Sequence, residues 1–220
     1  MIIDLGLTDY ETSYKTQKEF VRQRKFGEIE DSLIITEHHP VFTIGRTGKK
    51  ENLLVSEEIL AVRGIKVFCV DRGGDITFHG PGQIVLYPII NLKAGCADLH
   101  GYLRRLEAMV ISFLNAYSVK GETLSGKTGV WVEGKKLSFI GIGVTSWVTY
   151  HGLSVNIDVD LSFFSMMNPC GLKNIEVTSL SVVLNNTISM RDAKDKMVKH
   201  FTDIFDIRGP TREKHLAAVA

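Results

Sequence analysis

The sequence predicts an α/β protein of the α+β type, in which amphipathic helices pack on a β-sheet. Short apolar runs bounded by glycine, proline or polar residues indicate buried strands, most clearly at residues 65–70 and 84–90. Stretches with apolar side chains on successive helical turns, such as residues 98–117, indicate helices. The chain has 220 residues, of which 44% are hydrophobic, enough for one substantial core. We therefore expect a single domain over residues 1–220.

Four stretches are predicted as helices: residues 14–26, 56–63, 98–117 and 189–205. Ser56 and Asp98 are placed to cap the helices that follow them, and Gly27 is placed to stop the first helix. A short helical turn is expected at residues 160–164. The longest helix, at residues 98–117, should pack on the sheet through its apolar stripe.

The predicted strands are short and separated by turn residues. They are residues 31–35, 41–44, 65–70, 84–90, 129–132, 136–144 and 153–157. Cys69 lies within one of these apolar runs, so we expect it to be a small buried side chain. The glycines at 141 and 143 leave room beside the backbone of the strand at 136–144.

Composition excludes several classes of function. The formal charge is +1, from 26 basic and 25 acidic residues, so nucleic acid is not an expected partner. The sequence has neither a signal peptide at its start nor an apolar run long enough for a membrane span, which predicts a cytoplasmic protein. The cysteines at 69, 96 and 170 suggest no disulfide framework, and the adjacent His38 and His39 point to opposite faces of an extended segment, so we expect no metal site.

Residues 72–83, RGGDITFHGPGQ, are the most unusual stretch of the chain. They hold four glycines and a proline between two apolar runs, together with Arg72, Asp75, Thr77 and His79. Glycine allows a positive φ and a close backbone approach to a ligand. A plain hairpin turn is the alternative, but the concentration of polar side chains favours a binding loop.

Cys170 is the cysteine best placed to react. It lies between a proline and a glycine in a predicted loop, although burial and neighbours decide thiol reactivity and the sequence leaves an incidental cysteine as an equal alternative. A nucleophilic thiol needs a base or a cation beside it. Lys136 opens an apolar strand and is the candidate, with an ordinary turn lysine as the alternative.

Five motifs resemble a known family. EHHPVFTIGR at residues 37–46, RGGDITFHGPGQIVLYP at 72–88, GKKLSFIGIGV at 134–144, TYHGLSVNI at 149–157 and NPCGL at 168–172 together resemble the LipB family of lipoyl(octanoyl) transferases. The resemblance implies the fold of the lipoate and biotin protein ligases, a mixed β-sheet flanked by helices. It also implies that Cys170 takes an octanoyl group as a thioester and that Lys136, and not Lys135, activates the thiol.

The resemblance further implies the residues that contact substrate. They are Arg72, Gly73, Gly74, Asp75, Ile76, Thr77, Phe78, His79, Phe139, Ile140, Gly141, Gly152, Leu153 and Ser154. Bare glycine backbone opens a slot for an acyl chain that Phe139, Ile140 and Leu153 can line. His79 and His151 are candidates to orient Lys136 or to shuttle protons, with buried structural histidines as the alternative.

The implied partners are small carrier proteins. Octanoyl-acyl carrier protein is the donor, and the lipoyl domains of 2-oxoacid dehydrogenase E2 subunits and the glycine cleavage H protein are the acceptors of a monomeric enzyme without cofactor or metal. We expect basic residues to steer these acidic carriers: Lys49, Lys50, Arg104 and Arg105. An ATP-dependent lipoate or biotin ligase of the same fold, or a binding module without turnover, are the alternatives.

One position departs from the family pattern. Gly143 stands where relatives usually carry arginine, which removes a cation beside the expected pocket, and Lys173 is the candidate to replace it.

Overall fold

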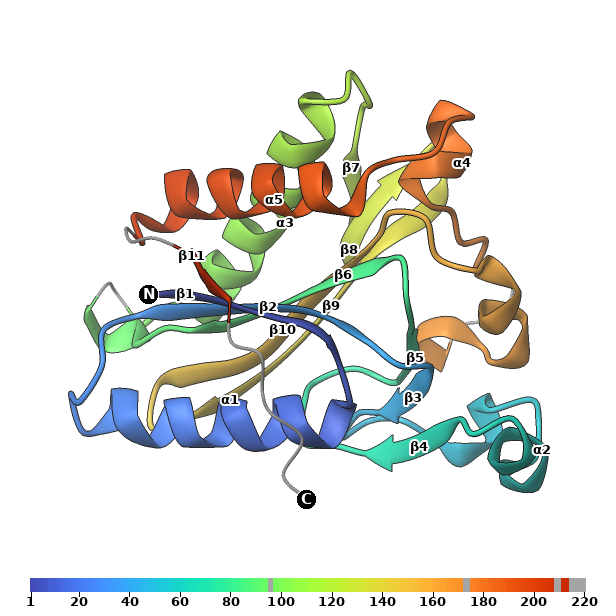
Figure 1. The fold of residues 1–220 in the computed structure, drawn as a ribbon, viewed down its shortest axis with the longest axis horizontal. Coiled ribbons are helices and arrows are strands. Elements are labelled where there is room, and N and C mark those ends of the chain that lie inside the picture. Colours follow the sequence, from blue (N-terminus) through green and yellow to red (C-terminus); the bar gives the residue numbers. More distant parts are fainter. Residues whose placement is uncertain (95–96, 172–174, 208–210, 214–220) are drawn as a thin grey trace.

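The computed structural model describes residues 1–94, 97–171, 175–207 and 211–213. At its centre is an eight-stranded sheet in the order β11-β1-β2-β6-β10-β9-β8-β7 (Figure 1). β1 pairs in parallel with both β11 and β2, and the other neighbours pair antiparallel, so the sheet is mixed as predicted. The strands are β1 (Ile2–Thr8), β2 (Ser32–His38), β6 (Gln83–Ile89), β7 (Glu122–Leu124), β8 (Lys127–Val132), β9 (Lys135–Thr145), β10 (Val148–Asn156) and β11 (Thr211–Glu213).

Helices cover both faces of this sheet (Figure 1). α1 (Tyr10–Lys25) lies on one face, and α3 (Leu99–Asn115) and α5 (Met190–Phe205) lie on the other. The short α4 (Leu180–Leu184) precedes α5. No helix in the described part of the chain is long and apolar enough to cross a membrane.

Alternate side chains along the strands of the large sheet point to opposite faces and form one buried cluster on each face. The buried cluster under α3 and α5 takes every second residue of the central strands, and the cluster under α1 takes the residues between them. The first cluster includes Ile2, Leu33, Leu86 and Phe113, and the second includes Ile3, Ile34, Val85 and Phe20.

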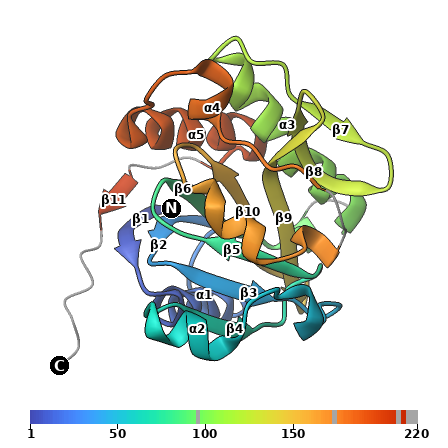
Figure 2. The same cartoon turned by 90° about the vertical axis from the view of Figure 1, so that its right-hand side faces the viewer.

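A second, three-stranded sheet lies to one side of the large sheet and faces the viewer in Figure 2. Its order is β4-β3-β5, with β3 (Val41–Ile44) parallel to β4 (Lys66–Cys69) and antiparallel to β5 (Ile76–His79). A third buried cluster joins it to α2 (Glu57–Val62) and the 3₁₀ helix η3 (Leu161–Met166). Further 3₁₀ turns are η1 (Lys50–Asn52), η2 (Leu92–Ala94) and η4 (Pro169–Gly171).

The predicted helices and the predicted strands are present, and Ser56 caps α2 as expected. Several predictions were wrong. The stretch at 72–83 is not only a loop, because β5 lies within it. Cys69 is exposed rather than buried, since β4 is an edge strand of the small sheet. Asp98 stands at the N-cap position of α3 but makes no capping hydrogen bond with its side chain.

Two boundaries also differ. α1 begins at Tyr10 rather than at residue 14, and β10 already begins at Val148. β1 was not predicted, although its apolar residues Ile2, Ile3 and Leu5 are buried. Cys96 and Lys173 lie outside the described residues.

Candidate active site

Cys170 and Lys136 are in direct contact. The Lys136 ammonium lies 3.2 Å from the Cys170 sulfur, although the residues are 34 positions apart in the sequence. Two backbone hydrogen bonds hold the strand of Lys136 beside the chain that follows Cys170: Lys136 N donates to Glu176 O, and Thr178 N donates to Lys136 O. Cys170 itself has a φ of 57°, in the left-handed region that non-glycine residues rarely adopt. Such backbone strain is typical of functional sites.

The ammonium of Lys136 is enclosed. Lys136 is 3% exposed, and its Nζ donates to Thr128 O at 3.0 Å. The same Nζ lies 4.7 Å from the ring centre of Trp131 and 4.9 Å from that of Phe139. A basic side chain and a potential nucleophile are thus in direct contact, shielded from solvent. Lys135 differs, since it pairs with Glu176 at the surface.

Gly129 makes room for this lysine. Its φ is +128°, and a Cβ there would lie 2.9 Å from Lys136 Cε and 2.5 Å from Ser138 O. Glu107 on α3 holds the position by accepting a hydrogen bond from Gly129 N at 3.0 Å. The helix therefore fixes the bare stretch of β8 against which the lysine packs.

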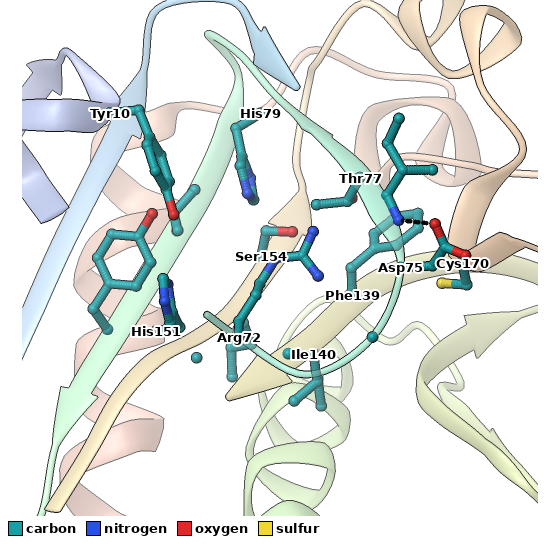
Figure 3. Close-up of a pocket in the computed structure, with 17 residues that line it drawn as sticks. Tyr10, Arg72, Asp75, Thr77, His79, Phe139, Ile140, His151, Ser154 and Cys170 are labelled. Atoms are coloured by element: carbon teal, nitrogen blue, oxygen red, sulfur yellow. Dashed lines mark hydrogen bonds between the residues drawn. The ribbon is translucent and has the colours of Figure 1, made fainter. Parts of the chain in front are cut away.

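A cavity begins at Cys170 (Figure 3). The part of its wall formed by Ile76, Phe139, Ile140 and Leu153 is apolar, as a site for an acyl chain requires. Of the residues that the family resemblance assigned to substrate, the cavity is lined by Arg72, Gly74, Asp75, Ile76, Thr77, His79, Phe139, Ile140, Gly141, Gly152, Leu153 and Ser154. His151 lines it as well.

A second cavity meets the first at Cys170. Lys136, Trp131 and Gly73 line it, and it shares Cys170, Gly74, Asp75, Ile140 and Gly141 with the first cavity. The thiol therefore stands where an inner pocket and an outer opening join.

Phe78 is the exception among the predicted contacts. It lies between Thr77 and His79 on β5, so its side chain points to the opposite face of that strand. There its ring stacks on Phe163 with the ring centres 4.4 Å apart, inside the third buried cluster. Its side chain supports the small sheet and does not form the cavity wall.

Asp75 holds the loop of Cys170 in place. Its carboxylate accepts hydrogen bonds from Ile76 N at 2.7 Å and Asn52 Nδ2 at 2.8 Å. It also lies so close to Gly171 that a Cβ on this glycine would collide with the carboxylate. Asn52 O in turn accepts from Asn168 N at 2.8 Å. The loop therefore has little freedom to move the thiol.

Arg72 is a buried cation in the cavity wall, 8% exposed. It donates to Thr43 O at 2.7 Å, Thr43 Oγ1 at 2.9 Å and Gly73 O at 3.0 Å. Burial lowers the pKa of its guanidinium from the usual value. Gly141 leaves space for it, because a Cβ there would lie 3.1 Å from Arg72 Cδ and 2.8 Å from Gly73 O.

His79 is neutral at pH 7. Burial lowers its pKa to about 3, and its Nδ1–H donates to Gln83 Oε1 at 2.7 Å. Gln83 Nε2 donates to Asn156 Oδ1, and Asn156 Nδ2 donates to Thr178 O. His79 is therefore a fixed hydrogen-bond acceptor at Nε2, and within the described structure it is not bonded to Lys136.

His151 belongs to a network on the α1 side of the cavity. Its Nε2–H donates to Asp71 Oδ1 at 2.9 Å, and burial lowers its pKa to about 4. Asp71 also accepts from Tyr150 OH at 2.8 Å, Tyr14 OH at 3.0 Å and Lys18 Nζ at 3.1 Å. In the described structure neither histidine orients Lys136 directly, so a supporting role fits both better than proton transfer to the lysine.

The departure at Gly143 has a steric reason. A Cβ there would lie 2.5 Å from the Tyr150 ring, whose hydroxyl is bound to Asp71. A larger residue would displace this ring. The absence of a side chain at Gly143 therefore allows the Tyr150 ring to keep the position in which its hydroxyl bonds to Asp71.

Several residues of the site were not predicted from the sequence. Tyr10, Val85 and Tyr87 line the inner cavity and Trp131 the outer one. Each lies in an apolar run or at a helix start, where a core position is the ordinary interpretation, so only their convergence in space reveals them. Within the described residues, no group of three or more histidine, cysteine or acidic side chains could hold a metal ion.

The fold is that of the lipoate and biotin protein ligases, as predicted. A bipartite lipoate protein ligase from Thermoplasma acidophilum superposes with a TM-score of 0.74 at 12% identity, over 98% of this chain and 87% of that one. A biotin protein ligase from Aquifex aeolicus gives a TM-score of 0.57 at 14% identity, over 93% of this chain and 70% of that one.

The family is established by sequence. Residues 9–202 match the lipoyl protein ligase A/B catalytic domain, and the chain belongs to this family. It is 44% identical to an octanoyltransferase from Rubrobacter xylanophilus, with 90% of both chains covered. It is 40% identical to an octanoyltransferase from Chloroflexus aggregans, over 94% of this chain and 95% of that one.

Proposed function

We propose that this protein is an octanoyltransferase of protein lipoylation. It transfers an octanoyl group from acyl carrier protein, through a thioester on Cys170, to the ε-amine of a lysine on lipoyl-dependent proteins. The observation that carries the proposal is the 3.2 Å contact between the enclosed Lys136 ammonium and the Cys170 sulfur at the mouth of a partly apolar cavity. Identity of 44% to an octanoyltransferase supports the same chemistry.

In the first half-reaction, Lys136 takes the proton of the Cys170 thiol. The thiolate attacks the carbonyl carbon of the donor thioester, so a sulfur–carbon bond forms to Cys170 and the bond to the carrier sulfur breaks. The Lys136 ammonium returns the proton to the departing carrier thiolate. A cation beside the sulfur favours the thiolate, and a lysine whose ammonium is shielded from water can alternate between base and acid.

In the second half-reaction, the amine of the acceptor lysine attacks the Cys170 thioester. An amide forms, the bond to the Cys170 sulfur breaks, and the proton lost by the attacking amine passes to Lys136 and restores the ammonium–thiolate pair. The open cavity beside Lys136, with Trp131 in its wall, gives both carriers access to the same sulfur.

The inner cavity holds the acyl chain during these steps. About seven apolar carbons of an octanoyl group gain roughly 5 kcal/mol if fully buried, at about 0.8 kcal/mol for each methylene. The bare backbones of Gly141 and Gly152 and the side chains of Phe139, Ile140 and Leu153 provide the walls.

The acceptors in this proposal are the lipoyl domains of E2 subunits and the glycine cleavage H protein, and the enzyme acts as a monomer. Of the four basic residues expected to steer acidic carriers, Lys50 pairs with Glu57 and Arg104 pairs with Glu107. Arg105 donates to Ile204 O and lies over the Phe205 ring. Lys49 is exposed, and Lys127 is exposed in the wall of the outer cavity. We therefore assign the steering to Lys49 and Lys127.

Transfer to a lipoyl domain tests the function. With octanoyl-acyl carrier protein as donor, we expect octanoylation of one lysine of the domain without ATP, and loss of nearly all turnover in Cys170→Ser, because an alkoxide is far less accessible than a thiolate. Activity from free octanoate and ATP, with none from the carrier thioester, would instead identify an ATP-dependent ligase. Tight binding of the lipoyl domain without transfer would identify a binding module.

A further inference from the structure

Three hydroxyl groups in the inner cavity wall are buried without a partner. They belong to Tyr10, Thr77 and Ser154, which are 5%, 6% and 2% exposed, and none has a hydrogen-bond partner among the described residues. Buried polar groups in folded proteins are nearly always hydrogen-bonded, either to protein or to ordered water. An octanoyl chain cannot supply such a bond, since its far end is a methyl group.

The side of the cavity remote from the thiol carries several polar side chains. Figure 3 shows Cys170 on one side, Arg72 and Ser154 in the middle, and His79, His151 and Tyr10 on the other side. His79 presents a free acceptor nitrogen there, because its Nδ1–H is bound to Gln83. The end remote from Cys170 therefore offers donors and acceptors suited to water.

Tyr10 is held rigidly at this end. It stands at the first position of α1, and its ring centre lies 5.4 Å from that of His38, 5.3 Å from that of Phe68 and 6.3 Å from that of His79. Packing on several sides prevents the ring from turning its hydroxyl to another partner. The hydroxyl thus remains in the cavity whichever acyl group is bound.

We propose that the part of the cavity from Ser154, in the middle, to Tyr10, on the side remote from Cys170, is a water-binding subsite that limits the length of the acyl chain, with Tyr10 and Ser154 as specificity-determining residues. The inference rests on the proposed function and deepens it. Water bound at these two hydroxyls stays in place when a medium-chain acyl group fills the apolar part next to Cys170. A longer chain displaces it and leaves the hydroxyls without partners.

The balance of two effects makes the subsite selective. Each added methylene that is buried strengthens binding about fourfold. Each buried hydroxyl left without a partner weakens binding by about 5- to 150-fold. Displacing water from Tyr10 and Ser154 together therefore outweighs the gain from one or two methylenes.

A competition experiment tests the proposal. Wild type and variants are exposed for less than one turnover to an equal mixture of octanoyl- and decanoyl-acyl carrier protein, and intact mass gives the ratio of the two acyl-enzymes. We expect wild type to favour octanoyl, and Tyr10→Phe and Ser154→Ala each to lower this ratio by at least about fivefold, because an apolar group no longer needs the water. The double variant should lower it further.

Tyr102→Phe is the matched control. This tyrosine belongs to α3, and its buried hydroxyl lies in the core cluster between that helix and the large sheet, not in the cavity wall, so the ratio should stay at the wild-type value. Unchanged ratios in Tyr10→Phe and Ser154→Ala, with thermal unfolding showing both to be folded, would overturn the proposal. If wild type forms neither acyl-enzyme, the proposed function itself fails, which separates the two outcomes.

Discussion

Replacing Lys136 by methionine isolates the contribution of its ammonium. Methionine keeps most of the apolar stem that packs against Trp131 and Phe139 and removes the charge 3.2 Å from the Cys170 sulfur. Without this charge the thiol loses the base that takes its proton, and the leaving carrier thiolate loses its proton donor. Acylation at pH 7 should therefore fall at least about 100-fold, since a positioned acid or base contributes roughly 10²–10⁴-fold.

The assay is rapid-quench acylation by octanoyl-acyl carrier protein, followed by intact mass. Lys135→Met is the control, because Lys135 pairs with Glu176 at the surface and should leave the rate at pH 7 unchanged. A Lys136→Met rate within threefold of wild type at pH 7 would refute the assigned role.

Three further predictions follow from the packing and charge of named residues. Gly129→Ala should slow acylation at least about tenfold, because a Cβ 2.9 Å from Lys136 Cε displaces the lysine, whereas Gly126→Ala, also at positive φ but with nothing within 4 Å, should retain the wild-type rate. His38 is fully buried with a pKa lowered to about 4, so its contribution to stability is complete above pH 6.5 and is lost as pH falls toward 4. Urea unfolding should show a loss of about 2 kcal/mol from this histidine between pH 7 and 5, and equal stability at both pH values would contradict it. Lys127→Glu should raise the KM for octanoyl-acyl carrier protein at low salt and little at 0.5 M salt, and a salt-independent effect would count against steering.

Local sequence patterns predicted where the helices and strands lie better than they predicted how buried those elements are. The helices at residues 56–63 and 189–205 were predicted because caps and apolar spacing are short-range signals. The exposure of Cys69 was not predicted. An edge strand and a central strand can have the same apolar composition, and they differ only in how many neighbouring strands pair with them. β5 was missed because glycine and proline surround a strand of four residues.

The candidate site also combines features that sequence motifs predict with features that only the tertiary structure reveals. Motif resemblance selected Cys170 and Lys136, whereas the residues alone left each with an ordinary alternative. Their 3.2 Å contact depends on pairing between β9 and the segment after Cys170, which no local pattern encodes. The left-handed φ of Cys170 and His151, and the gathering of four donors on Asp71, likewise arise from tertiary structure.

The most direct measurement is the mass of the intact protein after brief exposure to octanoyl-acyl carrier protein, with the modified peptide then sequenced. The account predicts one octanoyl adduct, carried by the sulfur of Cys170, and none on Cys170→Ala. An adduct of the same mass on Cys170→Ala, or octanoylation of a lipoyl domain by that variant at the wild-type rate, would contradict it.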